Sequence, residues 1–234
     1  MNLVKADWYR IRKERLSLVS LAILIVLSLI LAYSSSKELT AIGAEDILSN
    51  WTNLLPLFFV APAKIFFGDD FQFRTVNNSL VRTQNRLKIF THKWLSSVGL
   101  CVFYVLFAYM LTGFARQMMN GAADYGVLLE GFVYQLPFYI VIASFCTILF
   151  VIFPKIYQAY MVYILIAFLF DQLFMMATGI LLKTDFFADF MMFSQVSVAA
   201  DLENLLSWSS ILARVFSLGY FICGALLFSK KELK

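Results

Sequence analysis

LSLVSLAILIVLSLILAY, residues 16–33, is an unbroken apolar stretch that contains no charged side chain. An apolar helix of about 18 or more residues is long enough to cross the roughly 30 Å hydrocarbon layer of a membrane. The stretch is longer than the roughly 7–15 apolar residues at the centre of a cleaved signal peptide. We therefore interpret it as a retained membrane-spanning helix.

Five further apolar stretches follow this one. The composition agrees with a membrane protein, because 61% of the 234 residues are hydrophobic, whereas soluble domains are about 45–50% apolar. The whole chain, 1–234, is predicted to be one all-α, polytopic membrane domain. Its six expected transmembrane helices cover about 16–36, 47–67, 94–115, 127–153, 158–182 and 209–229.

The basic residues predict the orientation of these helices. With six spans, 15 Lys and Arg residues fall before the first span, in the even-numbered connections and in the tail, against 3 in the odd-numbered connections. Cytoplasmic segments carry such an excess of Lys and Arg. Both termini are therefore predicted to be cytoplasmic. The net charge of +4 alone fits a membrane or a nucleic-acid partner, and the uneven distribution of the basic residues favours the membrane.

The connection at 183–208 is expected to be extracellular and differs from an ordinary polar loop. It mixes aromatic side chains such as Phe186 and Trp208 with acidic ones such as Asp185 and Glu203. This mixture is typical of short helices that lie in the membrane interface. A hydrophobic loop packed against the ends of the spans is an equal alternative.

Enzyme signatures are absent from the sequence. It has no GxxxxGK[ST] loop for ATP and no HExxH or GxSxG motif. His92 is the single histidine, and Cys101, Cys146 and Cys223 lack the spacing of a metal site. We expect no catalytic residue, metal or cofactor in this chain.

Two charged residues, Asp171 and Arg214, lie well inside predicted spans. An unpartnered charge at that depth costs about 2.5–3.5 kcal/mol on insertion scales. Both residues fall in the outer half of adjacent antiparallel spans at similar depth. They are predicted either to form an ion pair or to face a transport pathway.

The segment between the second and third spans holds the most informative pattern. Phe73, Val76 and Leu80 follow the i, i+3, i+7 spacing of one helix face, so a short amphipathic helix is expected beside the membrane. From the residues alone, this helix contacts either lipid headgroups or a protein partner.

The same segment resembles the first cytoplasmic loop of ABC exporter permeases of the type-two class. Their pattern runs from an acidic-Phe pair through Thr, Asn, Leu, Arg and Ile to the Lys that opens the next span. The matching residues here are Asp70-Phe71, Thr75, Asn77 or Asn78, Leu80, Arg86, Ile89 and Lys93. The basic segment 1–15 also resembles the amphipathic connecting helix of that class.

The resemblance implies a mechanism and partners. Two membrane subunits would form the pathway above two separate ATPase subunits, which would bind ATP and Mg²⁺. The loop 68–93 would couple the spans to an ATPase through a set of residues within it. These coupling residues are Asp69, Asp70, Phe71, Phe73, Thr75, Val76, Leu80 and Arg82.

The general character of the chain is similar to that of small permeases from Gram-positive bacteria. These belong to peptide exporters, lantibiotic self-protection systems and phenol-soluble-modulin exporters. The similarity implies a location in the plasma membrane and export of amphipathic or hydrophobic peptides or lipophilic compounds. The alternative is a membrane anchor or scaffold without a transport pathway of its own.

Overall fold

The computed structural model describes residues 3–35, 43–73, 85–119, 123–181, 190–199 and 206–231. Regular structure within these ranges is entirely helical, which confirms the predicted all-α class for the described part of the chain. The longer helices are α2 (Arg15–Ser35), α3 (Gly43–Phe58), α7 (Arg86–Met118), α8 (Tyr125–Ile152) and α12 (Trp208–Lys230). The shorter elements are α1 (Leu3–Lys13), α4 (Val60–Ala63), α5 (Asp69–Gln72), α9 (Ile156–Leu165), α10 (Asp171–Leu181) and α11 (Met192–Ala199), with π-helices η1 (Lys64–Gly68) and η2 (Ile166–Phe170).

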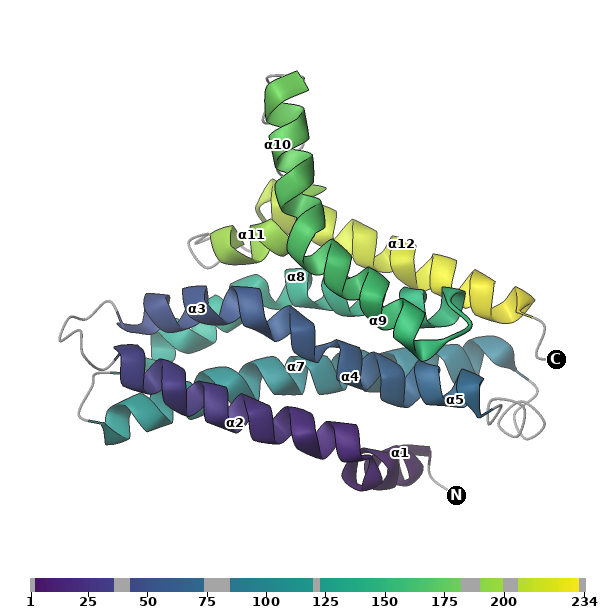
Figure 1. The fold of residues 1–234 in the computed structure, drawn as a ribbon, viewed down its shortest axis with the longest axis horizontal. Coiled ribbons are helices and arrows are strands. Elements are labelled where there is room, and N and C mark those ends of the chain that lie inside the picture. Colours follow the sequence, from purple (N-terminus) through teal and green to yellow (C-terminus); the bar gives the residue numbers. More distant parts are fainter. Residues whose placement is uncertain are drawn as a thin grey trace.

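Four of the described helices, α2, α7, α8 and α12, are long and apolar enough to cross a membrane. They lie lengthwise in an elongated bundle in which α7 contacts α2 and α8, and α12 lies along α8 (Figure 1). α1, the end of α5, the start of α7 and the end of α12 lie toward one end of this bundle (Figure 1). We call it the terminal end.

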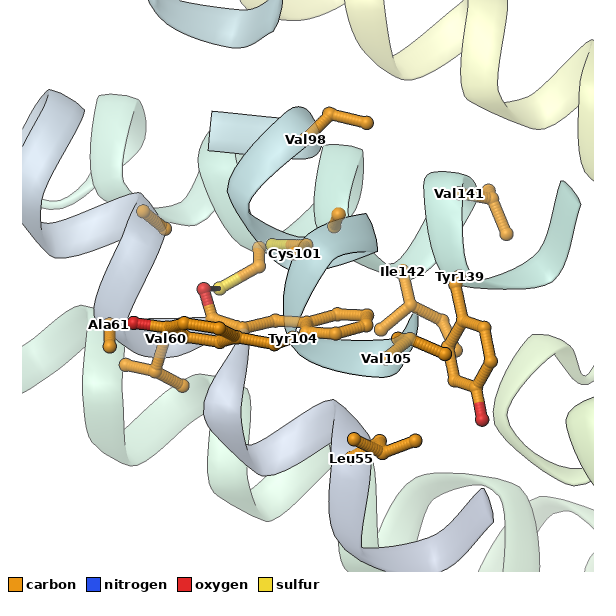
Figure 2. Close-up of a cluster of buried hydrophobic side chains, with 14 of the residues drawn as sticks. Leu55, Val60, Ala61, Val98, Cys101, Tyr104, Val105, Tyr139, Val141 and Ile142 are labelled. Carbon is orange, nitrogen blue, oxygen red and sulfur yellow. Dashed lines mark hydrogen bonds between the residues drawn. The ribbon is translucent and has the colours of Figure 1, made fainter. Parts of the chain in front are cut away.

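The core forms where α3, α4, α7 and α8 meet. α8 is the most deeply buried of the four long helices, whereas α2 and α12 leave most of their side chains exposed. Apolar faces of that kind suit contact with lipid or with another apolar surface. Figure 2 shows side chains of the core cluster, among them Leu55, Val60, Cys101, Tyr104, Val105, Tyr139 and Ile142.

Polar side chains in the core bond to one another. The Tyr109 hydroxyl contacts the Tyr139 hydroxyl at 2.8 Å and donates to the Gln135 side chain, whose Nε2 donates to the carbonyl oxygen of Val196 at 3.1 Å. Buried polar groups need such partners, because an unmade hydrogen bond costs about 1–3 kcal/mol. These bonds connect α7, α8 and α11 inside the bundle.

The predicted second span, 47–67, is a divided helix. From Gly43 to Gln72 the chain follows the bundle, with a turn at Phe59 and the π-helix η1. Pro56 and Pro62 lie in this region, and proline removes a helical hydrogen bond. The Tyr163 hydroxyl of α9 donates a hydrogen bond to the Pro56 carbonyl at 2.7 Å. A neighbouring helix therefore supplies a partner for this backbone carbonyl.

The predicted fifth span, 158–182, also differs from a single straight helix. It is divided into α9, η2 and α10, and α10 projects away from the bundle (Figure 1). A π-helical turn is a common cause of a bend in a helix. Four of the six expected spans therefore coincide with helices long and apolar enough to cross a membrane, and the segments expected as the other two are divided helices.

The connection at 183–208 is described in part. Its residues 192–199 form α11, which contacts α8 and α3, and its Val196 side chain is fully buried. The segment thus contains a short helix, as expected, but that helix packs into the bundle.

Candidate functional site

A cluster of charged side chains lies at the terminal end, where α1, η1, α5 and α7 meet. We call it the charged junction. α1 contributes Asp7 and Arg10 to it, and Glu14 is the residue between α1 and α2. Their spacing of three and four residues places them on one face of the helical N-terminal segment. The other members are Lys64, Asp69, Asp70, His92 and Lys93.

Asp70 is the centre of the charged junction. Its carboxylate forms ion pairs with Arg10 of α1 and with Lys93 of α7, and it is 3% exposed. The Lys93 ammonium also donates to the Phe66 carbonyl at 3.3 Å. Removing one partner from a buried ion pair typically costs about 3–5 kcal/mol, because the other charge is left uncompensated. Asp70 therefore fixes α1 and α7 to the end of the divided helix.

A second set of ion pairs lies beside the first. Lys64 pairs with Glu14 and with the Asp69 carboxylate, the latter at 3.2 Å. Burial raises the pKa of the Asp69 carboxyl, and the neighbouring Lys64 charge opposes that rise. Asp69 and Asp70 thus point into the protein, toward cations of the same chain, rather than outward to a partner.

Asp7 extends the junction along α7. Its carboxylate accepts a hydrogen bond from Ser96 at 2.8 Å and lies 3.4 Å from the Nδ1 of His92. Trp8 and Tyr9, the next residues of α1, are 69% and 61% exposed. α1 therefore docks through its charged face and leaves aromatic side chains exposed on the rest of its surface.

Phe71 lies in α5 and Phe73 directly follows it, and the two rings differ in their exposure. The Phe71 ring packs against Phe228 of α12 at a centroid distance of 5.8 Å, and the Lys231 ammonium lies 4.1 Å from its centre. Phe73 is 68% exposed. The prediction that both rings are available to a partner therefore applies to Phe73, since Phe71 contacts its own chain.

A hollow of about 610 Å³ lies next to these residues. It separates the end of the divided helix from the start of α9 and is lined by Lys64, Gln72, Lys155, Tyr157 and Tyr160, among others. The short connection 153–155 forms part of its wall. This combination of a hollow, two lysines and the exposed Phe73 makes the terminal end a candidate contact surface.

The remaining predicted site residues lie away from the charged junction or outside the described residues. Thr75, Val76, Leu80 and Arg82 belong to 74–84, beyond the described residues. Asp171 is buried and accepts hydrogen bonds from Ser194, whereas Arg214 is exposed.

The ion pairs found among the described residues do not include one between Asp171 and Arg214. The bend at η2 gives a physical reason, because it carries the start of α10 toward α11 instead of along α12. The Asp171 carboxylate then meets the first turn of α11.

Arg10, Lys64 and Lys93 pair with the two aspartates, a role that neither the distribution of basic residues nor the exporter-like pattern predicts. The acidic and basic side chains on one face of 7–14 were the available signal for a docked N-terminal segment. No three His, Cys, Asp or Glu side chains in the described ranges come together in the way a metal site requires.

Comparisons with known proteins add no assignment. A scan against protein-family models gives no match, and a search of the curated proteins finds no similar sequence.

Proposed function

We propose that the chain is the transmembrane permease subunit of an ATP-driven ABC exporter. It would act with a second membrane subunit and with a separate ATPase subunit that holds ATP and Mg²⁺. The divided helical segments 47–67 and 158–182 would provide the second and fifth of six crossings. The chain would lie in the plasma membrane of a Gram-positive bacterium and move amphipathic or hydrophobic peptides or lipophilic compounds outward.

One observation carries this proposal. Asp70 and Lys93, the acidic residue and the final lysine of the exporter-like pattern, contact each other although they are far apart in the sequence. The same Asp70 holds Arg10 of the N-terminal helix. A displacement of the segment that follows α5 would therefore be transmitted to α1 and α7 through these ion pairs. Such transmission suits rigid-body coupling between an ATPase and the membrane helices.

Co-purification with an ATPase tests the proposal. The chain is co-expressed with any P-loop ATPase that a neighbouring open reading frame is found to encode, and the amount of ATPase retained and its hydrolysis rate are measured. Truncating an aromatic anchor at an interface often costs 2 kcal/mol or more. Phe73→Ala should therefore weaken ATPase retention by about 30-fold in affinity while the membrane subunit stays inserted.

Phe114→Ala is the matched control. It makes the same change at a ring that is 51% exposed near the opposite end of α7, so ATPase binding should be unchanged. If the wild-type chain retains no ATPase, or if Phe73→Ala behaves like Phe114→Ala, the proposed coupling is wrong. The anchor or scaffold alternative would then be favoured.

A further inference from the structure

A cavity of about 220 Å³ lies where α10 leaves the bundle. Side chains from α8, η2, α10, α11 and α12 and from the residues just before α11 line it. Most of them are aliphatic or aromatic, and the exception is the carboxylate of Asp171. The cavity is therefore a partly open apolar pocket that contains one acidic side chain.

The Asp171 carboxylate is held in position by α11. Oδ2 accepts hydrogen bonds from the backbone N–H of Ser194 at 2.8 Å and from its hydroxyl at 3.1 Å. Both hydrogen bonds that the described residues donate to this carboxylate end on Oδ2, so Oδ1 can face the positive charge of a ligand. Asp171 takes part in none of the ion pairs found in the described ranges.

Aromatic rings form much of the cavity wall, and packing fixes their positions. Phe145 contacts Tyr220 at a centroid distance of 5.6 Å, and Phe193 contacts Tyr163 edge-on at 6.2 Å. Phe190 packs edge-on against Phe216 at 6.1 Å. The faces of such rings attract cations, most strongly where water is excluded.

We propose that this cavity binds the cationic group of a small amphipathic ligand, with Asp171 as its counter-ion and the surrounding rings as its apolar wall. A carboxylate buried among aromatic rings recognises positive charge and apolar surface together. A neutral ligand of the same shape gains only the apolar contact. The inference goes beyond the proposed transport function, because the cavity can bind such a ligand with or without an ATPase partner.

A structural role for Asp171 makes a different prediction. A carboxylate that serves only to cap the first turn of α11 can be replaced by an asparagine, whose side-chain oxygen accepts the same two hydrogen bonds. Asp171→Asn therefore keeps the cap and removes the charge, which separates the two roles.

Equilibrium dialysis of a matched ligand pair tests the proposal. The probes are benzyltrimethylammonium and neopentylbenzene, which share one shape and differ in replacing the quaternary nitrogen by carbon. The full chain is studied in dodecyl maltoside micelles, whose headgroup carries no charge, and binding to protein-free micelles is subtracted. We expect the wild-type protein to bind the cation at least about tenfold more tightly than its neutral counterpart, because the Asp171 charge and the ring faces attract the quaternary ammonium.

Variants locate the effect. Asp171→Asn removes the charge attraction, so it should lower the affinity for the cation about tenfold. The affinity for neopentylbenzene should stay within about twofold of the wild-type value. Ser194→Ala is the control, because it removes a hydrogen bond from the carboxylate but keeps the charge, so the preference for the cation should persist. The wild-type comparison alone remains decisive if a variant fails to fold.

Three results would overturn the proposal. The first is no binding of benzyltrimethylammonium above the micelle background, and the second is equal binding of the two probes. The third is an equal loss of both probes in Asp171→Asn. None of these results depends on ATPase association, so failure here is distinguishable from failure of the transport proposal.

Discussion

Gly224 shows at the scale of one residue how α12 is seated on the bundle. A Cβ atom at this position would lie 2.8 Å from the Phe90 ring and 3.3 Å from Ile148. The Phe90 ring has little freedom to move, since it is 1% exposed and packs against Phe67 and Phe221, each at 5.6 Å. The missing side chain is therefore what lets α12 approach α7 and α8.

Gly224→Ala is expected to destabilise the protein by about 1–3 kcal/mol, the typical effect of overpacking. Gly219→Ala is the control on the same helix, because a Cβ there would meet nothing within 4 Å. It should be neutral or stabilising by up to about 1 kcal/mol, as alanine favours a helix over glycine. Thermal unfolding in detergent measures both, and equal effects would contradict the packing argument.

At the scale of an element, α1 is positioned by ion pairs together with one partly buried apolar side chain, Ile11. Trp8 and Tyr9 remain exposed, while Asp7 and Arg10 bond to α7 and α5. A short helix has little stability of its own in water. The ion pairs of the charged junction must therefore supply much of its docking free energy.

Arg10→Ala should release α1 from Asp70. Because hydrogen bonds to charged groups contribute about 1.5–3 kcal/mol, amide hydrogen exchange across 3–13 should accelerate roughly tenfold or more. Arg12→Ala removes the same charge from an exposed position of this helix and should leave exchange unchanged. The exchange of peptides covering 3–13 is measured by mass spectrometry in both variants. The same exchange rate in Arg10→Ala and Arg12→Ala would show that Arg10 does not hold α1.

At the scale of the whole molecule, the bundle gathers the predicted cytoplasmic segments at one end. α1, the end of α5, the start of α9 and the end of α12 all lie toward the terminal end (Figure 1). Such an arrangement is expected of a chain with an even number of crossings, and cysteine labelling tests on which side of the membrane this end lies.

Single cysteines at Lys13, Arg82 and Lys155 should react with a membrane-impermeant maleimide only after the cells are opened. Cysteines at Ala123 and Ala199 should react in intact cells. The reason is the excess of Lys and Arg on one side of the predicted spans.

The background for this labelling lacks the exposed native thiol Cys223, which is replaced by serine. The buried thiols Cys101 and Cys146 serve as an internal check, because they should stay unlabelled in the folded protein. Labelling of Arg82 in intact cells would reverse the predicted orientation.

Much of the fold follows from the sequence. The stretch 16–33 and its three long counterparts specify membrane-length helices by apolar length alone, since a bilayer of fixed thickness selects for it. The basic residues likewise predict that both termini share one side. These signals are local or additive along the chain, so one sequence is enough to reveal them.

The tertiary structure decided the pairing of charges. Asp70 lies 60 residues from Arg10 in the chain, and no local spacing relates it to Lys93. Asp171 meets Ser194 instead of Arg214 because a π-helical turn redirects α10, which depth along a straight helix cannot foresee. A charge in a low-dielectric region selects whichever partner the packing of the helices brings within reach, and that packing exists only in the folded bundle.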